Sequence, residues 1–249
     1  MKIFIPLVLM ITNLIGQSGY EIAKMVDEKA QPKDMVSKTT MVLTNNKGKT
    51  RTSTMHSKTM NGGEKQIIWF LAPADDKGVS FLKIEHDGKD DEMRMWLPAF
   101  KKVRRIASTK KGDSFMGSDL SYEDLTSREL EENEYKRLED EVIDGVDCYL
   151  LEITPKPEAE STYSKHLSWI NKETLTGFKE QSFDKRGALK KQKNFSFSAM
   201  ENYHVMQRIF VEDVQKNHTT EITFKDIAVD SGINESLFQE KNLKRIPRN

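Results

Sequence analysis

Apolar and polar residues alternate along much of the chain, which is the pattern of strands that bury one face. In the middle of the chain the alternation runs through Met93, Met95 and Leu97, breaks at Pro98, and has resumed by Ile106. Successive side chains of a strand point to opposite faces, and proline cannot donate a hydrogen bond within a sheet. The pattern therefore predicts two extended strands joined by a proline turn.

Similar runs fill the rest of the chain and are separated by Asn, Asp and Gly, which tolerate the positive φ that tight hairpins require. Besides the central pair, the predicted strands cover residues 35–44, 49–60, 66–71, 79–84, 146–154, 165–171, 176–183, 189–200, 209–213 and 219–229. Residues 66–71, QIIWFL, are apolar on both faces, so Trp69 or Phe70 must face a ligand, a helix or a second layer. Regularly spaced strands predict a mainly β fold, either a barrel or a highly curved sheet.

Two segments depart from this alternation. Residues 19–30 carry Ile22, Met25 and Val26 at helical spacing, which predicts a short amphipathic helix that Pro32 ends. Large apolar residues also recur at spacings near three and four after the central strands, at Phe115, Met116, Leu120 and Tyr122. This second pattern predicts a short helix or an ordered loop, and such a lid could shield an apolar cavity when the cavity is empty.

The charge-dense residues 127–141 predict a solvated helix or edge strand.

The chain begins with an apolar run, residues 3–16, behind Lys2. The run is too short for a comfortable bilayer span and predicts a secretory signal peptide, residues 1–18, with cleavage after Gly16 or Ser18. No cysteine follows the run, so we expect a periplasmic protein that is not lipid-anchored. No repeat or linker interrupts the remainder, and residues 19–249 are predicted to form a single domain.

Composition narrows the classes of function. The 249 residues include 39 basic and 39 acidic side chains, so overall charge favours neither nucleic acid nor an anionic membrane surface as a partner. A hydrophobic fraction of 37% is enough for the core of one large β domain. Cys148 is the single cysteine, which excludes an internal disulfide and a multi-cysteine zinc site. Its place in an apolar strand predicts a buried, inert thiol.

No pattern in the sequence predicts an enzyme. The five histidines are scattered singly, no serine lies in a G-x-S-x-G elbow, and phosphate-binding and dinucleotide-binding loops are missing. Glu123 and Asp124 are adjacent and lack the separate environments that an acid–base pair needs. We therefore expect no catalytic residue, no metal and no cofactor. A basic cluster at residues 101–105 predicts either an outward strand face or a contact with lipid phosphates or an acidic partner.

The central stretch MWLPAFKKVRRI, followed by FMGSDLSYEDL, resembles the LolA/LolB-like family, specifically its outer-membrane lipoprotein-sorting protein branch. The likeness continues through WFLAPADDKGVSFL and TEITFKDIAVDSGINESLF and covers most of the chain after about Met35. It implies an incomplete, strongly curved antiparallel β-barrel with short helices covering its mouth. It also implies a membrane partner of the lipoprotein-releasing or RND transporter type. In carriers of this group a barrel arginine holds the lid shut, and Arg94 and Arg104 are the candidates here.

The leading hypothesis is a monomeric periplasmic carrier that binds acyl chains of lipid or lipoprotein in the apolar concave face and delivers them toward the outer membrane. The predicted lining residues are Ile67, Trp69, Phe81, Met93, Met95, Leu97, Trp169, Phe178, Phe195 and Phe197. The predicted lid residues are Phe115, Met116, Leu120 and Tyr122. Two alternatives remain open: a non-catalytic sensor or accessory module of an RND-type transporter that binds a protein partner, and a lipid hydrolase.

Overall fold

The computed structural model of the protein describes residues 16–86 and 88–247. The predicted signal peptide, residues 1–18, therefore lies almost wholly outside the described residues. Within the described part, α1 and the 3-10 turns are too short or too polar to cross a membrane.

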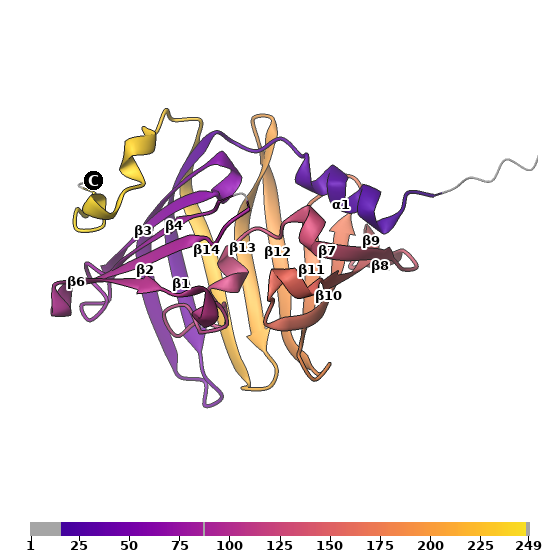
Figure 1. The fold of residues 1–249 in the computed structure, drawn as a ribbon, viewed down its shortest axis with the longest axis horizontal. Coiled ribbons are helices and arrows are strands. Elements are labelled where there is room, and N and C mark those ends of the chain that lie inside the picture. Colours follow the sequence, from indigo (N-terminus) through magenta and orange to yellow (C-terminus); the bar gives the residue numbers. More distant parts are fainter. Residues whose placement is uncertain (1–15, 87, 248–249) are drawn as a thin grey trace, which may run out of the picture.

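A single antiparallel sheet of 14 strands makes up most of the molecule (Figure 1). Its strands are β1 (Asp34–Thr44), β2 (Thr50–Met60), β3 (Lys65–Ala72), β4 (Ser80–Ile84), β5 (Glu92–Leu97), β6 (Lys102–Ile106), β7 (Asn133–Arg137), β8 (Glu141–Ile143), β9 (Val146–Pro155), β10 (Tyr163–Asn171), β11 (Gly177–Asp184), β12 (Leu189–Met200), β13 (Tyr203–Asp213) and β14 (His218–Val229). The spatial order is β6-β5-β4-β3-β2-β1-β14-β13-β12-β11-β10-β9-β7, and β8 pairs with β9. Pairing of β1 with β14 joins the two halves.

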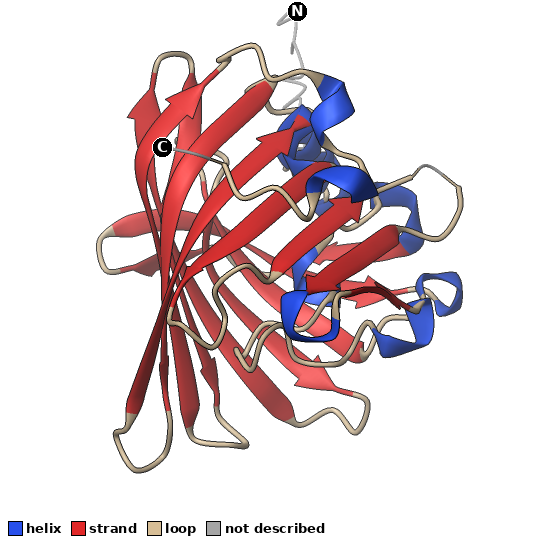
Figure 2. Ribbon diagram, turned by 90° about the vertical axis from the view of Figure 1, so that its left-hand side faces the viewer, coloured by secondary structure: helices blue, strands red, loops and turns tan. Residues whose placement is uncertain are grey.

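The sheet curls strongly but stays open, because β6 and β7 form separate edges that do not pair with each other (Figure 2). The predicted incomplete, curved antiparallel barrel is thus confirmed. The largest differences from the predicted strands are that β13 begins at Tyr203 rather than at residue 209 and that the short strand β8 was not predicted. The first residues of β13 show weak alternation, and it is the pairing of Tyr203 with Met200 of β12 that extends the strand. The charge-dense residues 127–141 contain the edge strand β7.

The predicted amphipathic helix is α1 (Gly19–Asp27), which covers one end of the sheet (Figure 1). Its N-terminus is fixed by a capping box in which the Ser18 hydroxyl accepts from the Glu21 amide and the Glu21 carboxylate accepts from the Ser18 amide. Ile22 packs against the buried Leu151 of β9. Gly19 lies so close to β7 that a Cβ atom would come within 2.7 Å of the Arg137 backbone nitrogen. The remaining helical pieces are 3-10 turns: η1 (Asn61–Gly63), η2 (Pro98–Phe100), η3 (Ser108–Lys110), η4 (Glu123–Leu125), η5 (Leu130–Glu132), η6 (Pro157–Ala159), η7 (Glu235–Leu237) and η8 (Glu240–Asn242).

Residues 107–132, named here the lid segment, connect β6 at one edge of the sheet to β7 at the other. The segment therefore crosses the open mouth of the curled sheet. It is an ordered loop with 3-10 turns rather than an α-helix. We call the sheet face on which it packs the lid face, and the opposite face the outer face.

Each face of the sheet has its own apolar core. On the lid face, Phe70 and Phe81 pack against Phe115 of the lid segment. On the outer face, Trp69 of β3 is covered by the C-terminal residues 230–247, and its indole Nε1 donates to the Asn242 carbonyl at 3.3 Å. The second layer expected over QIIWFL is thus the C-terminal segment of the chain itself.

Candidate functional site

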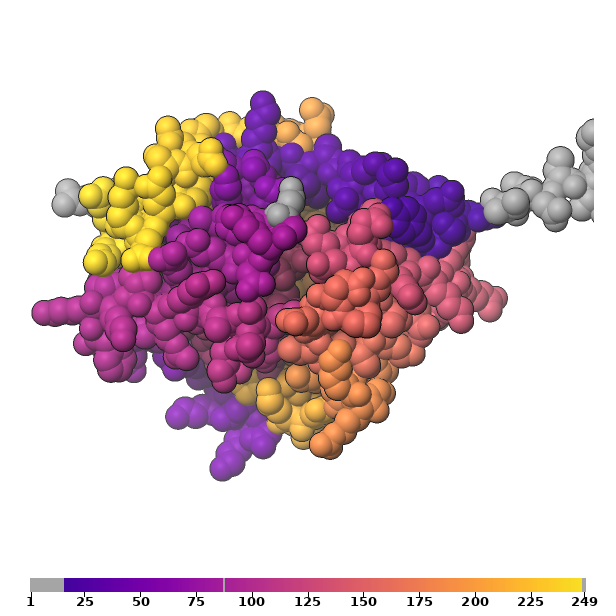
Figure 3. All heavy atoms as spheres, viewed as in Figure 1, coloured from indigo at the N-terminus to yellow at the C-terminus, as the bar shows by residue number. Residues whose placement is uncertain are grey.

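A cavity of about 870 Å³ opens between the lid segment and the lid face of the sheet. Figure 3 shows a hollow between the magenta part of the chain and the pink and orange parts opposite. Its walls come from the connection between β4 and β5, the lid segment, the loop between β9 and β10, and the lid face of β10–β13. Segments far apart in the sequence therefore meet around one space.

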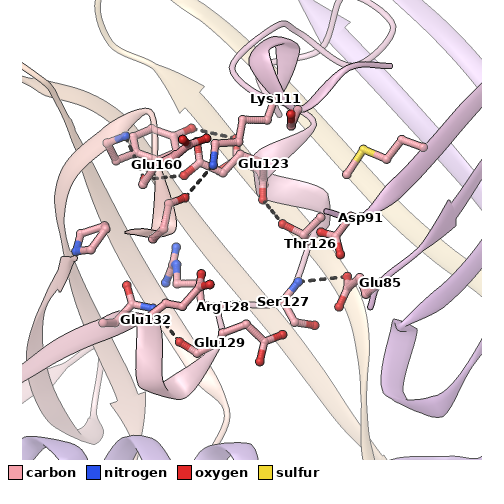
Figure 4. Close-up of a pocket in the computed structure, with 18 of the residues that line it drawn as sticks. Glu85, Asp91, Lys111, Glu123, Thr126, Ser127, Arg128, Glu129, Glu132 and Glu160 are labelled. Atoms are coloured by element: carbon pink, nitrogen blue, oxygen red, sulfur yellow. Dashed lines mark hydrogen bonds between the residues drawn. The ribbon is translucent and has the colours of Figure 1, made fainter. Parts of the chain in front are cut away.

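The cavity is amphipathic. Its apolar wall is formed by Met93, Ile106, Leu120, Phe195, Met206 and Ile209. Its mouth is polar and mostly acidic, as Figure 4 shows for Glu85, Asp91, Glu129, Glu132 and Glu160. Lys111 crosses part of the mouth, where its ammonium group donates to the Ala159 carbonyl at 2.6 Å. A ligand with an apolar body and a polar end fits such a space better than a wholly apolar ligand.

Apolar side chains of the lid segment fill the interior beside the cavity. Phe115 lies edge-on to Phe81, with ring centroids 5.2 Å apart, and Tyr122 lies 6.0 Å from the same ring. Phe115, Leu120 and Tyr122 are buried, and Met116 packs against the same core. All four predicted lid residues thus occupy the lid face, in a closed arrangement.

Polar contacts tie the lid segment to the sheet on the β14 side. The Asp119 amide donates to the Thr220 hydroxyl at 2.8 Å. The Asp119 carboxylate in turn accepts from that hydroxyl at 2.7 Å and lies 2.7 Å from Nδ1 of His218. Buried and multiply bonded, Asp119 anchors the middle of the lid segment.

Two further contacts hold the end of the lid segment. The Lys83 ammonium of β4 donates to the Leu125 carbonyl at 2.6 Å. The Glu123 carboxylate accepts from the Thr162 amide at 2.9 Å and from the Ser161 hydroxyl. β4 and the loop between β9 and β10 therefore bind the same turn of the lid segment, η4, from opposite sides of the mouth.

The strongest polar contacts of the lid segment are made by Asp124, whose side chain is 2% exposed. Its carboxylate lies 2.6 Å from the Lys191 ammonium and 2.5 Å from the Lys193 ammonium, both on β12. The Tyr163 hydroxyl donates to the same carboxylate at 2.9 Å. Lys191 and Lys193 are themselves almost fully buried, so the carboxylate compensates part of their charge inside the protein.

Glu180 of β11 extends this arrangement into a buried charge cluster. Arg128 of the lid segment binds its carboxylate in bidentate fashion at 2.6 and 2.8 Å. Lys193 donates to it at 3.0 Å, and the Ser168 hydroxyl at 2.9 Å. Together with Asp124 and Lys191, the cluster holds three cationic and two anionic groups, and it forms one wall of the cavity.

The environment of the cluster fixes its charge states. Burial alone would raise the pKa of Asp124, but the ammonium groups of Lys193 and Lys191 hold it well below its usual range. Burial likewise opposes ionisation of Glu180, yet the charges of Arg128 and Lys193 lower its pKa. Burial lowers the pKa of Lys191, whereas two carboxylates outweigh burial and raise the pKa of Lys193. The neighbouring His166 is neutral, since burial and the Arg128 charge lower its pKa to about 3.

The ten predicted lining residues are divided between the two faces. Phe81, Met93 and Met95 are buried in the lid-face core, and Leu97 and Phe195 pack against it. Phe197 pairs with Met206, which also packs against that core. Among these, Met93 and Phe195 line the cavity itself.

The other four lie on the outer face. Ile67 and Trp69 are under the C-terminal segment, while Trp169 and Phe178 pack around the buried Cys148. The reason is alternation: Ser168 of β10 points into the charge cluster, so its neighbour Trp169 must point away from it. These four residues do not border the cavity.

Neither candidate arginine holds the lid segment through a hydrogen bond. Arg94 binds Glu92 at 2.6 Å and also binds Glu240, so it fastens the C-terminal segment instead. Arg104 is exposed on β6. The lid segment is bound by lysines of β12 and β4. The arginine that takes part, Arg128, belongs to the lid segment itself and binds Glu180 of the sheet.

Sequence reasoning missed the charge cluster. A signal was present, since Lys191 and Lys193 precede Phe195 and Phe197 at strand spacing and so share a face with two residues that were assigned to the apolar lining.

In the part of the chain that the structure describes, no three His, Cys, Asp or Glu side chains are grouped so that they could hold a metal ion.

Comparisons with known proteins agree with this architecture. The sequence profile of a family of uncharacterized proteins matches residues 62–245, and no curated protein matches the chain. An outer membrane lipoprotein-sorting protein domain from Vibrio parahaemolyticus is 31% identical, over 91% of this chain and 98% of that one, with a TM-score of 0.86. A DUF1329 family protein from Desulfovibrio piger is also 31% identical, over 90% and 97% of the two chains, with a TM-score of 0.86. A LolA superfamily protein from Nitrosomonas europaea shares the fold at 17% identity, over 91% and 99%, with a TM-score of 0.71. The chain therefore belongs to the same family as the outer membrane lipoprotein-sorting protein domain and the DUF1329 family protein, and it has the LolA-like fold.

Proposed function

We propose that this protein is a periplasmic carrier that binds the acyl chains of a lipid or lipoprotein on the lid face of its sheet and delivers them toward the outer membrane. The observation that carries the proposal is the cavity of about 870 Å³ beside a lid segment that fills the rest of the interior with apolar side chains. Each buried CH₂ group of an acyl chain contributes about 0.8 kcal/mol. The likeness to a lipoprotein-sorting domain supports this class of ligand.

In this proposal the side chains of the lid segment take the place of an acyl chain when no ligand is bound. Phe115 covers Phe70 and Phe81, so displacement of the lid segment would extend the apolar wall of the cavity along the lid face. A longer chain could then be buried than the closed cavity holds. The polar contacts of Asp119 and Asp124 would set how readily the lid segment leaves.

A disulfide between positions 119 and 220 should block ligand uptake reversibly. In the double variant Asp119→Cys/Thr220→Cys, the two cysteines replace residues in direct contact, since the Thr220 hydroxyl lies 2.8 Å from the Asp119 backbone nitrogen. We expect the oxidised protein to bind a fluorescent fatty acid at least about tenfold more weakly than the same protein after reduction, measured by fluorescence titration.

The two single variants are the controls, because neither can form the bridge. Asp119→Cys loses the carboxylate contacts with His218 and Thr220, and Thr220→Cys loses the hydroxyl contacts with Asp119. Cys148 is buried and should not compete. Equal binding before and after reduction, with the bridge verified by mass, would mean that uptake does not require the lid segment to move.

Phe195→Asp should also weaken acyl-chain binding at least about tenfold, because it places a carboxylate on the apolar wall of the cavity. Phe100→Asp is the matched control, since Phe100 is 76% exposed and far from that wall in the turn after β5. Binding would be compared by the same titration, after thermal unfolding has verified that both variants are folded. If the two variants bind alike, the ligand does not use this wall.

We extend the proposal to export and delivery. A signal peptide at residues 1–18 would bring residues 19–249, as one monomeric domain, into the periplasm; the pairing of β1 with β14 supports a single unit. A transporter of the RND or lipoprotein-releasing type would then displace the lid segment. A protein that is purified without lipid and captures a polypeptide would instead favour an accessory module of such a transporter.

A further inference from the structure

We propose that Lys191, Lys193 and Tyr163 form a binding site for the anionic head group, a phosphate or carboxylate, of the acyl ligand, and that Asp124 occupies this site while the lid segment is closed. The inference rests on the proposed carrier function and names the chemical class of its ligand: an amphiphile with an anionic head.

The first support is the geometry around Asp124. Its Oδ2 accepts from Lys191 at 2.6 Å and from the Tyr163 hydroxyl at 2.9 Å, and its Oδ1 accepts from Lys193 at 2.5 Å. These three donors belong to β10 and β12, so they stay in place when the lid segment moves. They converge on two oxygens of one anionic group, which is how proteins bind carboxylates and phosphates.

The second support is the charge that lid opening would leave behind. Asp124 and Arg128 both belong to the lid segment and would leave together. The sheet would keep two ammonium groups, Lys191 and Lys193, against the single carboxylate of Glu180. The two lysine side chains are only 4% and 5% exposed beneath the closed lid segment, and both would lose the counter-ion Asp124 when it opens, so an arriving anion is the group that would take its place.

The third support is that the site continues into the apolar wall. Lys193 and Phe195 are two residues apart on β12, point to the same face, and both line the cavity. Met206 and Ile209 of β13 continue that wall. An anionic head at Lys193 would thus have its acyl chain beside Phe195, and the cavity would select for both parts of one molecule.

The test compares two lipids with the same acyl chains, dioleoylphosphatidic acid and dioleoylglycerol, which differ in the phosphate. We expect the unaltered mature protein to bind the phosphatidic acid at least about tenfold more tightly, as measured by titration from mixed detergent micelles. Lys193→Met and Lys191→Met should each bring the two affinities close together. Lys225→Met, the same change at an exposed position of β14, should leave the preference intact.

Two further variants keep the test decisive if the lysine variants do not fold. Tyr163→Phe removes one donor and should reduce the preference several-fold, and Asp124→Asn removes the competing carboxylate and should strengthen binding of the phosphatidic acid. Binding of both lipids without preference would overturn the head-group site and leave the carrier function standing. Binding of neither lipid would overturn both. Inorganic phosphate that binds as tightly as the phosphatidic acid would also overturn the inference, since the site would then serve a free anion.

Discussion

Replacing Glu180 by glutamine should lower the free energy of unfolding by about 3–5 kcal/mol. Glu180 is 7% exposed and is the carboxylate that joins Arg128 to Lys193. Glutamine keeps the size of the side chain but loses the negative charge, so Asp124 alone would face the two buried lysines and the partly exposed Arg128. Removal of one partner from a buried ion cluster is costly because the remaining charges cannot regain their hydration. Urea unfolding at pH 7 measures the difference.

The same substitution on the surface is the control. Glu221 pairs with Arg208 across β13 and β14, and both side chains are 40% exposed. Because exposed ion pairs contribute little, Glu221→Gln should change the free energy of unfolding by less than about 1 kcal/mol. Similar losses in the two variants would contradict the view that Glu180 is the centre of a buried charge cluster.

Local sequence patterns were sufficient for most of the strands and for an apolar ordered loop after the central pair. Alternation set the extents of most strands, and the turns followed from residues such as Gly48 and Gly62, which do adopt positive φ. Phe115 and Tyr122 stood out because large apolar residues in an otherwise polar loop need a core to pack against. Both inferences depend on neighbours in the chain, which is why they could be made without knowing the fold.

The faces of the strands were harder to assign. Residues 66–71 are apolar on both sides, so the sequence could not show that Ile68 and Phe70 face the lid segment while Trp69 faces the C-terminal segment. That assignment depends on which distant part of the chain covers each face. Phe238 and Leu243, which bury Trp69, are more than 160 residues away from it and lie in a segment with little pattern of its own.

The charge cluster was missed for a different physical reason. Charged residues are rarely buried, so the strand predicted at 189–200 did not mark Lys191 and Lys193 as buried, and Asp124 was considered only as the neighbour of Glu123. Their burial is tolerated only because β12, β11 and the lid segment bring opposite charges within 3.0 Å of one another. Such compensation between distant residues leaves no trace in local hydropathy. The polar end of the cavity was therefore the part of the site that required the structure.

The protein should lose stability as the pH falls from about 6.5, and His166 should account for much of the loss, up to about 1.4 kcal/mol per pH unit. In the unfolded chain a histidine takes up a proton near its ordinary pKa of 6.5, whereas burial and the charge of Arg128 lower the folded-state pKa of His166 to about 3. Between these values the unfolded state binds more protons, so acid favours unfolding. Because the pKa values of Asp124 and Glu180 are also lowered in the folded state, these carboxylates add to the loss only below about pH 4.5.

His166→Gln should therefore flatten the stability profile between pH 6.5 and 5, where the carboxylates do not yet contribute. Urea unfolding at intervals of half a pH unit measures how the free energy of unfolding changes with pH. His56→Gln is the matched comparison, since burial also lowers the pKa of His56 but its ring lies away from the cluster, beside Trp69 on the outer face. We expect this second variant to remove a smaller part of the slope. If His166→Gln leaves the pH profile unchanged, His166 takes up its proton in the folded protein as readily as in the unfolded chain. The cavity wall around its side chain would then be less shielded from water than its exposed fraction of 2% implies.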